Sequence, residues 1–167
     1  MDSIVKNLIY ERKILSIGET IINLSLISVN YDFENYYLET TNRRYSLKIN
    51  KKSVDQCSVI NRMYNDIKFN PLTSREIYYS DPEILLMEYF QAESSDMRFL
   101  NQHIFGESIA KFHTKRESYY GYGYDTYIGS LLQENKMSQS WKKFYLNQRF
   151  DCLLSKMKET LSINREL

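Results

Sequence analysis

The sequence predicts an α+β fold in which a five-stranded antiparallel sheet with one inserted helix precedes an all-helical part. Three observations predict it. Runs of strand length fill most of the first 90 residues, one segment of helical spacing interrupts them, and helical spacing returns after residue 94. Runs of strands followed by runs of helices are typical of this class, so we expect one region over residues 1–90 and a second over 91–167.

The composition is that of an ordinary globular protein. Hydrophobic residues make up 43% of the 167 residues, charged residues make up 26%, and the net charge is +1. This balance gives no overall field that would attract nucleic acid or an anionic membrane, so we expect neither as a partner. The chain has no apolar run of about 18 residues and no leader-like N-terminus, so we expect no membrane span and no secretion signal.

The two cysteines indicate a reducing compartment. Cys57 and Cys152 lie far apart in the sequence and lack the spacing of metal ligands. We therefore expect two reduced thiols in a cytoplasmic protein, because disulfides persist mainly in oxidising compartments.

The N-terminal part combines one short helix with three strands. Residues 3–13 have the spacing of an amphipathic helix, with Ile4, Leu8 and Ile9 on one side. In RYSLKIN, strict alternation sends Leu47 to one face and Lys48 to the other, which is the polar face. The three expected strands span residues 19–29, 33–40 and 44–50.

A helix is expected next, over residues 53–67, with Ser53 as its N-cap and Ile60, Tyr64 and Ile67 as its apolar line. Two more strands follow around the turn Asp81-Pro82, and they cover residues 75–80 and 83–90. The run ILLM, residues 84–87, is apolar on both faces. Such a run is typical of a central strand that is covered on both sides.

The C-terminal part is expected to be helical. Helical spacing continues to residue 115, a loop covers residues 121–129, and Ser138 is placed to cap a final helix around Trp141. This part also contains the most distinctive string of the sequence, YGYGYDTYIGSLLQENKMSQSWKKFYLNQR. Its marked positions are Tyr122, Gly123, Asp125, Ile128, Gly129, Gln133, Asn135, Trp141, Phe144, Tyr145 and Arg149.

This string resembles the fructosamine (ketosamine) kinase family, a relative of the aminoglycoside phosphotransferases. The preceding helix end, IAKFH at residues 109–113, also matches, and the resemblance covers roughly residues 20 to 150. Two positions depart from the family pattern: Thr126 stands where Asn is usual, and Leu132 stands where Pro is usual. The resemblance implies a protein-kinase-like N-lobe over residues 1–90, then a hinge and the first helices of a truncated C-lobe over residues 91–167.

The resemblance also implies an activity, which is ATP-dependent phosphorylation of the sugar hydroxyl of a glycated amine, with ATP and Mg as cofactors. Lys48 would contact the nucleotide phosphates. Glu88, Tyr89 and Phe90 would form the hinge and hold adenine through backbone groups. The non-functional alternatives are that Lys48 is an ordinary solvent-exposed lysine on a strand, and that residues 88–90 are only the end of a buried strand.

The resemblance makes residues 121–149 a connector between the two lobes. Three of its polar residues, Asp125, Gln133 and Asn135, could position the loop itself or bind a sugar-like substrate through hydrogen bonds. Trp141 and Arg149 are expected to anchor the final helix. These residues identify the segment as the connector of the family, but none of them is a candidate catalytic residue.

Features needed for phosphoryl transfer are missing. The stretch VNYDFENYY, residues 29–37, holds no glycine, although the family's nucleotide loop carries it for close approach to phosphate. The family's lysine pairs with a helix glutamate, whose place falls near Ile60, but the helix offers only Asp55 and Asp66 at its ends.

The catalytic loop is missing as well. The family carries a His-Gly-Asp loop and a magnesium-binding Asp, whereas His103 and His113 here open no such loop. We therefore expect no catalytic or metal-binding residue in this chain, and inactivity unless a separate polypeptide supplies the C-terminal half. The alternative is a non-catalytic module that binds a partner or self-associates through exposed helical faces.

Overall fold

The computed structural model divides the chain into two compact units, Met1–Phe112 and His113–Leu167. The division into a sheet region and a helical region at residue 90 remains a prediction. The structure describes residues 2–52, 54–67, 75–90, 98–114 and 116–163.

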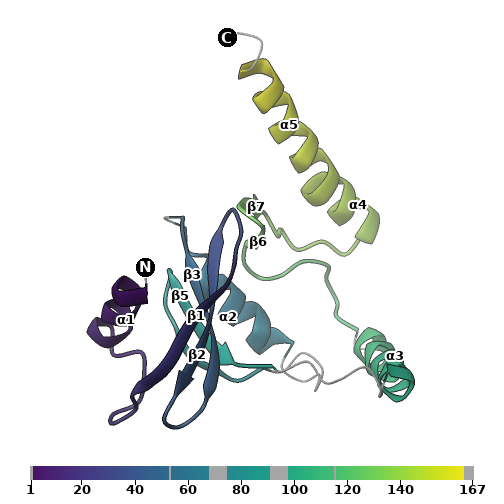
Figure 1. The fold of residues 1–167 in the computed structure, drawn as a ribbon. Helices are drawn as coiled ribbons and strands as arrows, with labels where there is room; N and C mark the ends of the chain where they lie inside the picture. The colour runs from purple at the N-terminus through teal and green to yellow at the C-terminus, as the bar shows by residue number, and fades with distance from the viewer. Residues whose placement is uncertain (1, 53, 68–74, 91–97, 115, 164–167) are drawn as a thin grey trace. The chain divides into compact units, whose positions relative to one another are not determined.

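The first unit is built on a five-stranded antiparallel sheet with the strand order β1-β2-β3-β5-β4 (Figure 1). One helix, α2 (Gln56–Asp66), is inserted between β3 and β4, so the expected sheet with one inserted helix is confirmed. β3 is the central strand. The strands are β1 (Ile21–Val29), β2 (Phe33–Thr40), β3 (Arg44–Asn50), β4 (Ile77–Ser80) and β5 (Ile84–Glu88).

Two helices cover opposite faces of this sheet (Figure 1). Val5 and Ile9 of α1 (Asp2–Glu11) pack in the larger apolar cluster, which includes Leu47 of β3. Cys57 of α2 packs on the other face in a smaller cluster with Phe33. The sheet is therefore the middle layer between two helices.

The doubly covered strand predicted from ILLM is β5. Ile84 and Leu86 face the cluster under α1, whereas Leu85 and Met87 face the cluster under α2. All of them are buried. Because both faces of β5 are covered, the alternation of polar and apolar residues disappears from its sequence.

α1 ends in a motif that fixes its orientation. Lys13 adopts a left-handed conformation at φ 52°, and Ile14 N–H donates to Ile9 C=O at 3.1 Å. This pattern is a Schellman cap, in which the residue after the left-handed one packs on the last helical turn. The buried side of the helix differs from the expected one, because Val5 is buried while Ile4 is 72% exposed.

An ion pair joins the end of α1 to the turn between β4 and β5. The Arg12 guanidinium donates to Asp81 Oδ2 at 2.6 Å and also to Glu83. Burial alone would raise the pKa of Asp81, but hydrogen bonds from Arg12 and from backbone N–H groups outweigh it and hold that pKa below its ordinary value. The turn predicted at Asp81-Pro82 is therefore held by α1.

The inserted helix begins later than expected. α2 starts at Gln56 with Asp55 at its N-cap, and Asp55 makes no side-chain capping bond. Residue 53, the expected cap, lies outside the described residues. Ile60 and Tyr64 pack against the smaller cluster, as the predicted apolar line requires.

The C-terminal part contains a hairpin where a loop and an all-helical region were expected. β6 (Thr126–Ile128) pairs with β7 (Leu131–Gln133), and Gly129 takes a φ of 55° in the turn between them. Gly-Ser between two short apolar runs is a hairpin signal that the helical reading of this region missed. The helices of this part are α3 (Arg98–Thr114), α4 (Trp141–Tyr145), the π-helical turn η2 (Leu146–Phe150) and α5 (Asp151–Ile163).

The cap of α4 is also displaced from the expected residue. Ser140, not Ser138, accepts a hydrogen bond from Lys143 N–H at 3.4 Å. Ser138 instead accepts from Ser140 N–H and pairs through its backbone with Tyr120. Within the described ranges, no helix has the length and apolar character needed to cross a membrane.

Truncation of the central core should test this layer arrangement. We expect Leu86→Ala to lower the free energy of unfolding by about 2 to 5 kcal/mol. The substitution opens a cavity in the apolar cluster between β5 and α1, where Leu86 is buried. The measurement is urea denaturation followed by circular dichroism.

Ile22→Ala, at a β1 side chain that is 64% exposed, is the control. It should cost less than about 1 kcal/mol. Equal losses for Leu86→Ala and Ile22→Ala would contradict the assignment of β5 as the buried strand.

Candidate functional site

Lys48 lies on β3, the central strand of the sheet. It is opposite Asn35 of β2 and Leu85 of β5 in the strand register. Its ammonium Nζ lies 4.8 Å from the centre of the Phe33 ring, on the face that α2 covers. A charged group is therefore half-buried against an apolar cluster.

The surroundings of Lys48 hold no counter-charge among the residues that the structure describes. Burial lowers the pKa of Lys48, and the nearby Arg75 guanidinium acts in the same direction. The α2 residue beside it is Cys57, which is 0% exposed. Burial raises the pKa of Cys57 to about 12, so this thiol is neutral near pH 7. The α2 group that interacts with Lys48 is thus an uncharged side chain.

The β1–β2 turn uses its backbone donors internally. Asn30 Oδ1 accepts from the N–H groups of Asp32 at 3.0 Å and Phe33 at 2.7 Å. Asp32 is 7% exposed, and its C=O accepts from Lys51 N–H at 2.7 Å. In this conformation the glycine-free turn offers these N–H groups to its own asparagine rather than to a phosphate.

The segment expected to form the hinge contacts the residue that precedes β4 and a residue of β2. Glu88 N–H donates to Glu76 C=O at 2.8 Å, so this donor is already used. The Tyr89 ring meets the Tyr37 ring edge-on, with centroids 4.8 Å apart. Tyr89 therefore lies on the same face of the sheet as Lys48, since Tyr37 and Phe33 share that face of β2.

The connector is organised around Asn135. This side chain is 5% exposed and donates to Tyr124 C=O at 3.0 Å and to Thr126 Oγ1 at 2.8 Å. Its backbone N–H donates to Asp125 Oδ1 at 3.0 Å. The structure thus joins two of the three predicted connector residues, while the third, Gln133, contributes its backbone C=O at 3.3 Å.

Arg149 anchors the final helix to this connector, as expected. It lies in the π-helical turn, over the Phe144 ring at 4.6 Å, and donates to Glu134 C=O at 3.0 Å and to Asn135 Oδ1. Burial lowers its pKa. Trp141 is less enclosed than an anchor requires, because it is 55% exposed beside Tyr120 and Tyr145.

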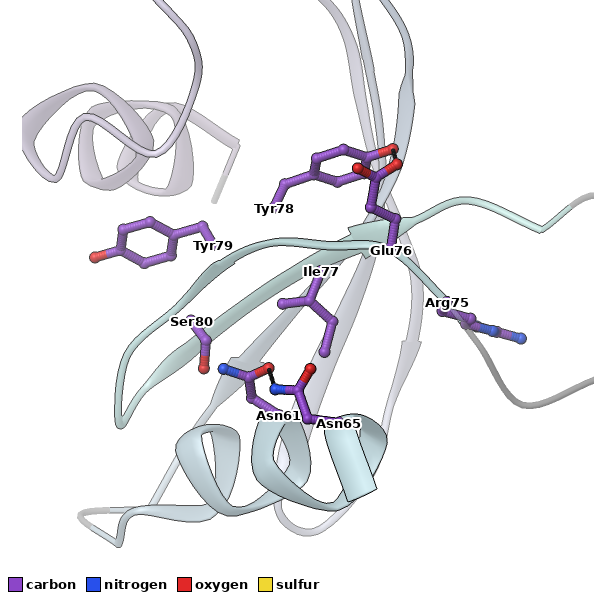
Figure 2. Close-up of a pocket in the computed structure, with 8 residues that line it drawn as sticks. All are labelled: Asn61, Asn65, Arg75, Glu76, Ile77, Tyr78, Tyr79 and Ser80. Carbon is purple, nitrogen blue, oxygen red and sulfur yellow. Dashed lines mark hydrogen bonds between the residues drawn. The ribbon is translucent and has the colours of Figure 1, made fainter. Parts of the chain in front are cut away.

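A separate pocket of about 420 Å³ opens beside α2 and β4 (Figure 2). Figure 2 shows Asn61 and Asn65 of α2 facing Ile77 and Ser80, with Arg75 pointing away from them. Asn65 Nδ2 donates to Asn61 Oδ1 at 3.1 Å, so these two amides are paired through one hydrogen bond. The pocket contains none of the site residues expected from the sequence.

In the part of the chain that the structure describes, no three His, Cys, Asp or Glu side chains gather closely enough to hold an ion. The described residues thus place a cationic group on one face of the central strand, in the same sheet as the strand that leads into residues 88–90, which are exposed or half-buried.

Two solved structures share this architecture. The first, from Haemophilus somnus, has a TM-score of 0.71 and 21% identity, with 93% of this chain and 54% of that chain covered. The second, from Thermobifida fusca, has a TM-score of 0.64 and 20% identity, with 79% and 47% covered. Both are provisionally described as fructosamine-3-kinases. The chain therefore has the protein-kinase-like fold of those proteins.

Sequence comparison specifies the family. A model of the fructosamine kinase family matches residues 12–165, so the chain belongs to that family. A probable ketoamine kinase of Enterococcus faecium is 26% identical over 132 residues, which cover 76% of this chain and 46% of that protein. The chain thus spans about half the length of the relatives that it matches.

Asn135→Ala should loosen the connector. Its removal takes away a hydrogen-bond partner of the Thr126 hydroxyl, the Tyr124 carbonyl and the Arg149 guanidinium, which should cost about 1 to 3 kcal/mol of local stability. We expect faster amide hydrogen exchange over residues 124–136, measured by mass spectrometry. Gln133→Ala is the control, and equal acceleration in that variant would contradict the central role of Asn135.

Lys48→Met should stabilise the fold at pH 7. A lysine whose folded-state pKa lies below its unfolded value destabilises the fold at low and neutral pH, and this penalty disappears as the pH rises through the unfolded pKa of about 10.4. The gain should therefore shrink between pH 7 and pH 10.5 in urea denaturation. Lys51→Met, at an exposed position, should show no such trend. A Lys48→Met variant less stable than wild type at pH 7 would refute the assignment of an uncompensated charge.

Proposed function

We propose that this chain supplies the nucleotide-binding side of a fructosamine (ketoamine) kinase. The observation that carries the proposal is the half-buried ammonium of Lys48 on the central strand, without a carboxylate partner among the described residues. Such a group reduces fold stability unless an anion compensates it, and family membership makes the nucleotide polyphosphate the natural anion. The substrate class would be a glycated amine.

The residues fit a nucleotide in two places. Lys48 would neutralise charge on the phosphates, while backbone groups of Glu88, Tyr89 and Phe90 would bind the adenine edge. Since Glu88 N–H is already donated to Glu76, the donor for adenine would come from Tyr89 or Phe90. Asp125 and Gln133 would border the sugar, and Asn135 would hold that loop in place.

Catalysis is not assigned to these residues. The 167 residues contain no His-Gly-Asp loop, and the described ones form no metal cluster. Magnesium would supply charge neutralisation at the phosphates if the remainder of a kinase fold provided its ligands. We therefore propose that these residues alone bind a nucleotide but do not transfer its phosphoryl group. We also propose a cytoplasmic location, because the free thiols of Cys57 and Cys152 suit a reducing compartment.

The test is isothermal titration of the chain with ATP and magnesium, with thermal unfolding measured in parallel. Saturating ATP at 100 times its Kd should raise the free energy of unfolding by about 2.7 kcal/mol. Lys48→Met should weaken binding at least tenfold, and adenosine should bind equally to both proteins because it carries no phosphate. ADP release in the presence of a small fructosamine should be absent. No heat and no thermal shift with millimolar ATP would refute the proposal.

A second candidate function is a non-catalytic module that binds a protein partner or self-associates. It is favoured by a row of exposed apolar side chains on the C-terminal helices: Tyr145, Leu146, Phe150, Leu153, Leu154 and Met157. Size-exclusion chromatography with light scattering would test self-association, and Leu153→Glu should dissociate any assembly. A monomer at every concentration, together with nucleotide binding, would favour the first function.

A further inference from the structure

The carboxylate that normally orients a kinase lysine is absent from α2, yet Lys48 is held in a defined place. The group in contact with its ammonium is the face of Phe33, at 4.8 Å from the ring centre. This distance lies within the range over which a cation is attracted to an aromatic face. The ring belongs to the same buried cluster as Cys57, Leu85 and Met87, so it is itself immobilised by packing.

The position of Phe33 is fixed by the turn that precedes it. Its N–H donates to Asn30 Oδ1 at 2.7 Å, and its C=O accepts from Asn30 N–H at 2.9 Å. On its other side Phe33 pairs with Asn50 of β3. The β1–β2 turn, which lacks the glycines for binding phosphate, therefore places an aromatic ring beneath the lysine instead.

From this arrangement we infer that Phe33 is the positioning residue of Lys48, and that its ring replaces the helix carboxylate and leaves the whole ammonium charge available to an anionic ligand. The inference rests on the proposed function for the identity of that ligand, a nucleotide polyphosphate. A carboxylate would neutralise part of the charge before the ligand arrives, whereas an aromatic face orients the ammonium and keeps its net charge.

The groups around Lys48 agree with this assignment. Cys57 from α2 is a neutral thiol, and Arg75, which precedes β4, adds a second positive charge to the same region. The β2 and β5 residues opposite Lys48 are Asn35 and Leu85, which carry no charge. Because the positive charge is uncompensated here, binding of an anion should raise the pKa of Lys48 and take up protons at alkaline pH.

The test compares Phe33→Leu with Tyr64→Leu and Phe33→Tyr. Phe33→Leu keeps an apolar side chain but removes the ring face that contacts Lys48. Tyr64→Leu is the control, because it removes an aromatic ring that packs against the same cluster but is not the ring over which the Lys48 ammonium lies. Phe33→Tyr restores the ring and should rescue both readouts. The readouts are ATP affinity by titration calorimetry and the Lys48 pKa by NMR of ¹³C-labelled lysine.

We expect Phe33→Leu to weaken ATP binding by roughly two- to thirtyfold, the range that corresponds to a cation–π contact, and to lower the Lys48 pKa further. Tyr64→Leu should change neither. Unchanged affinity and unchanged pKa in Phe33→Leu would overturn the inference. If the wild type binds no ATP, the proposed function fails, while the NMR comparison still decides whether Phe33 positions Lys48.

Discussion

The first unit depends on one electrostatic constraint, which is a lysine ammonium placed on the central strand of a sheet that is covered on both faces. Such a charge lowers stability unless something compensates it. The described residues provide an aromatic face and a neutral thiol, and neither cancels the charge. The sheet can carry this cost because β5 beside it is buried on both sides and α1 is fixed to the β4–β5 turn by Arg12. Stability supplied by the core thus supports an uncompensated charge, which the proposed nucleotide would compensate.

The connector is stabilised differently, by hydrogen bonds rather than by apolar burial. Asn135 is its centre, and it joins the hairpin to the final helix through Arg149. The substitution of Thr126 for the family's usual Asn is accommodated because the Thr126 hydroxyl accepts from the Asn135 amide. The distinctive string of the sequence therefore marks a structural hub, in which Asn135 is buried while Asp125 is exposed and Gln133 half-buried.

Much of the fold follows from local pattern. The ILLM run predicted the doubly covered β5, and alternation placed Lys48 opposite the apolar face of β3. Local sequence patterns were less informative where the position of a side chain depends on how several helices and strands pack together. Ile4 and Val5 are both apolar, and the local pattern did not distinguish the buried Val5 from the exposed Ile4. The Phe33–Lys48 contact needed the β2–β3 register and the Asn30 turn, neither of which leaves a local signal. The hairpin at residues 126–133 did leave one, in its Gly-Ser turn.

The most direct measurement of the central claim is protection of Lys48 from chemical modification by ATP. Limited acylation followed by peptide mass spectrometry reports the reactivity of each lysine, and Lys51, one residue beyond β3 and exposed, is the internal reference. The account predicts that ATP slows acylation of Lys48 in a concentration-dependent way and leaves Lys51 unchanged. Equal acylation of Lys48 with and without saturating ATP would contradict it.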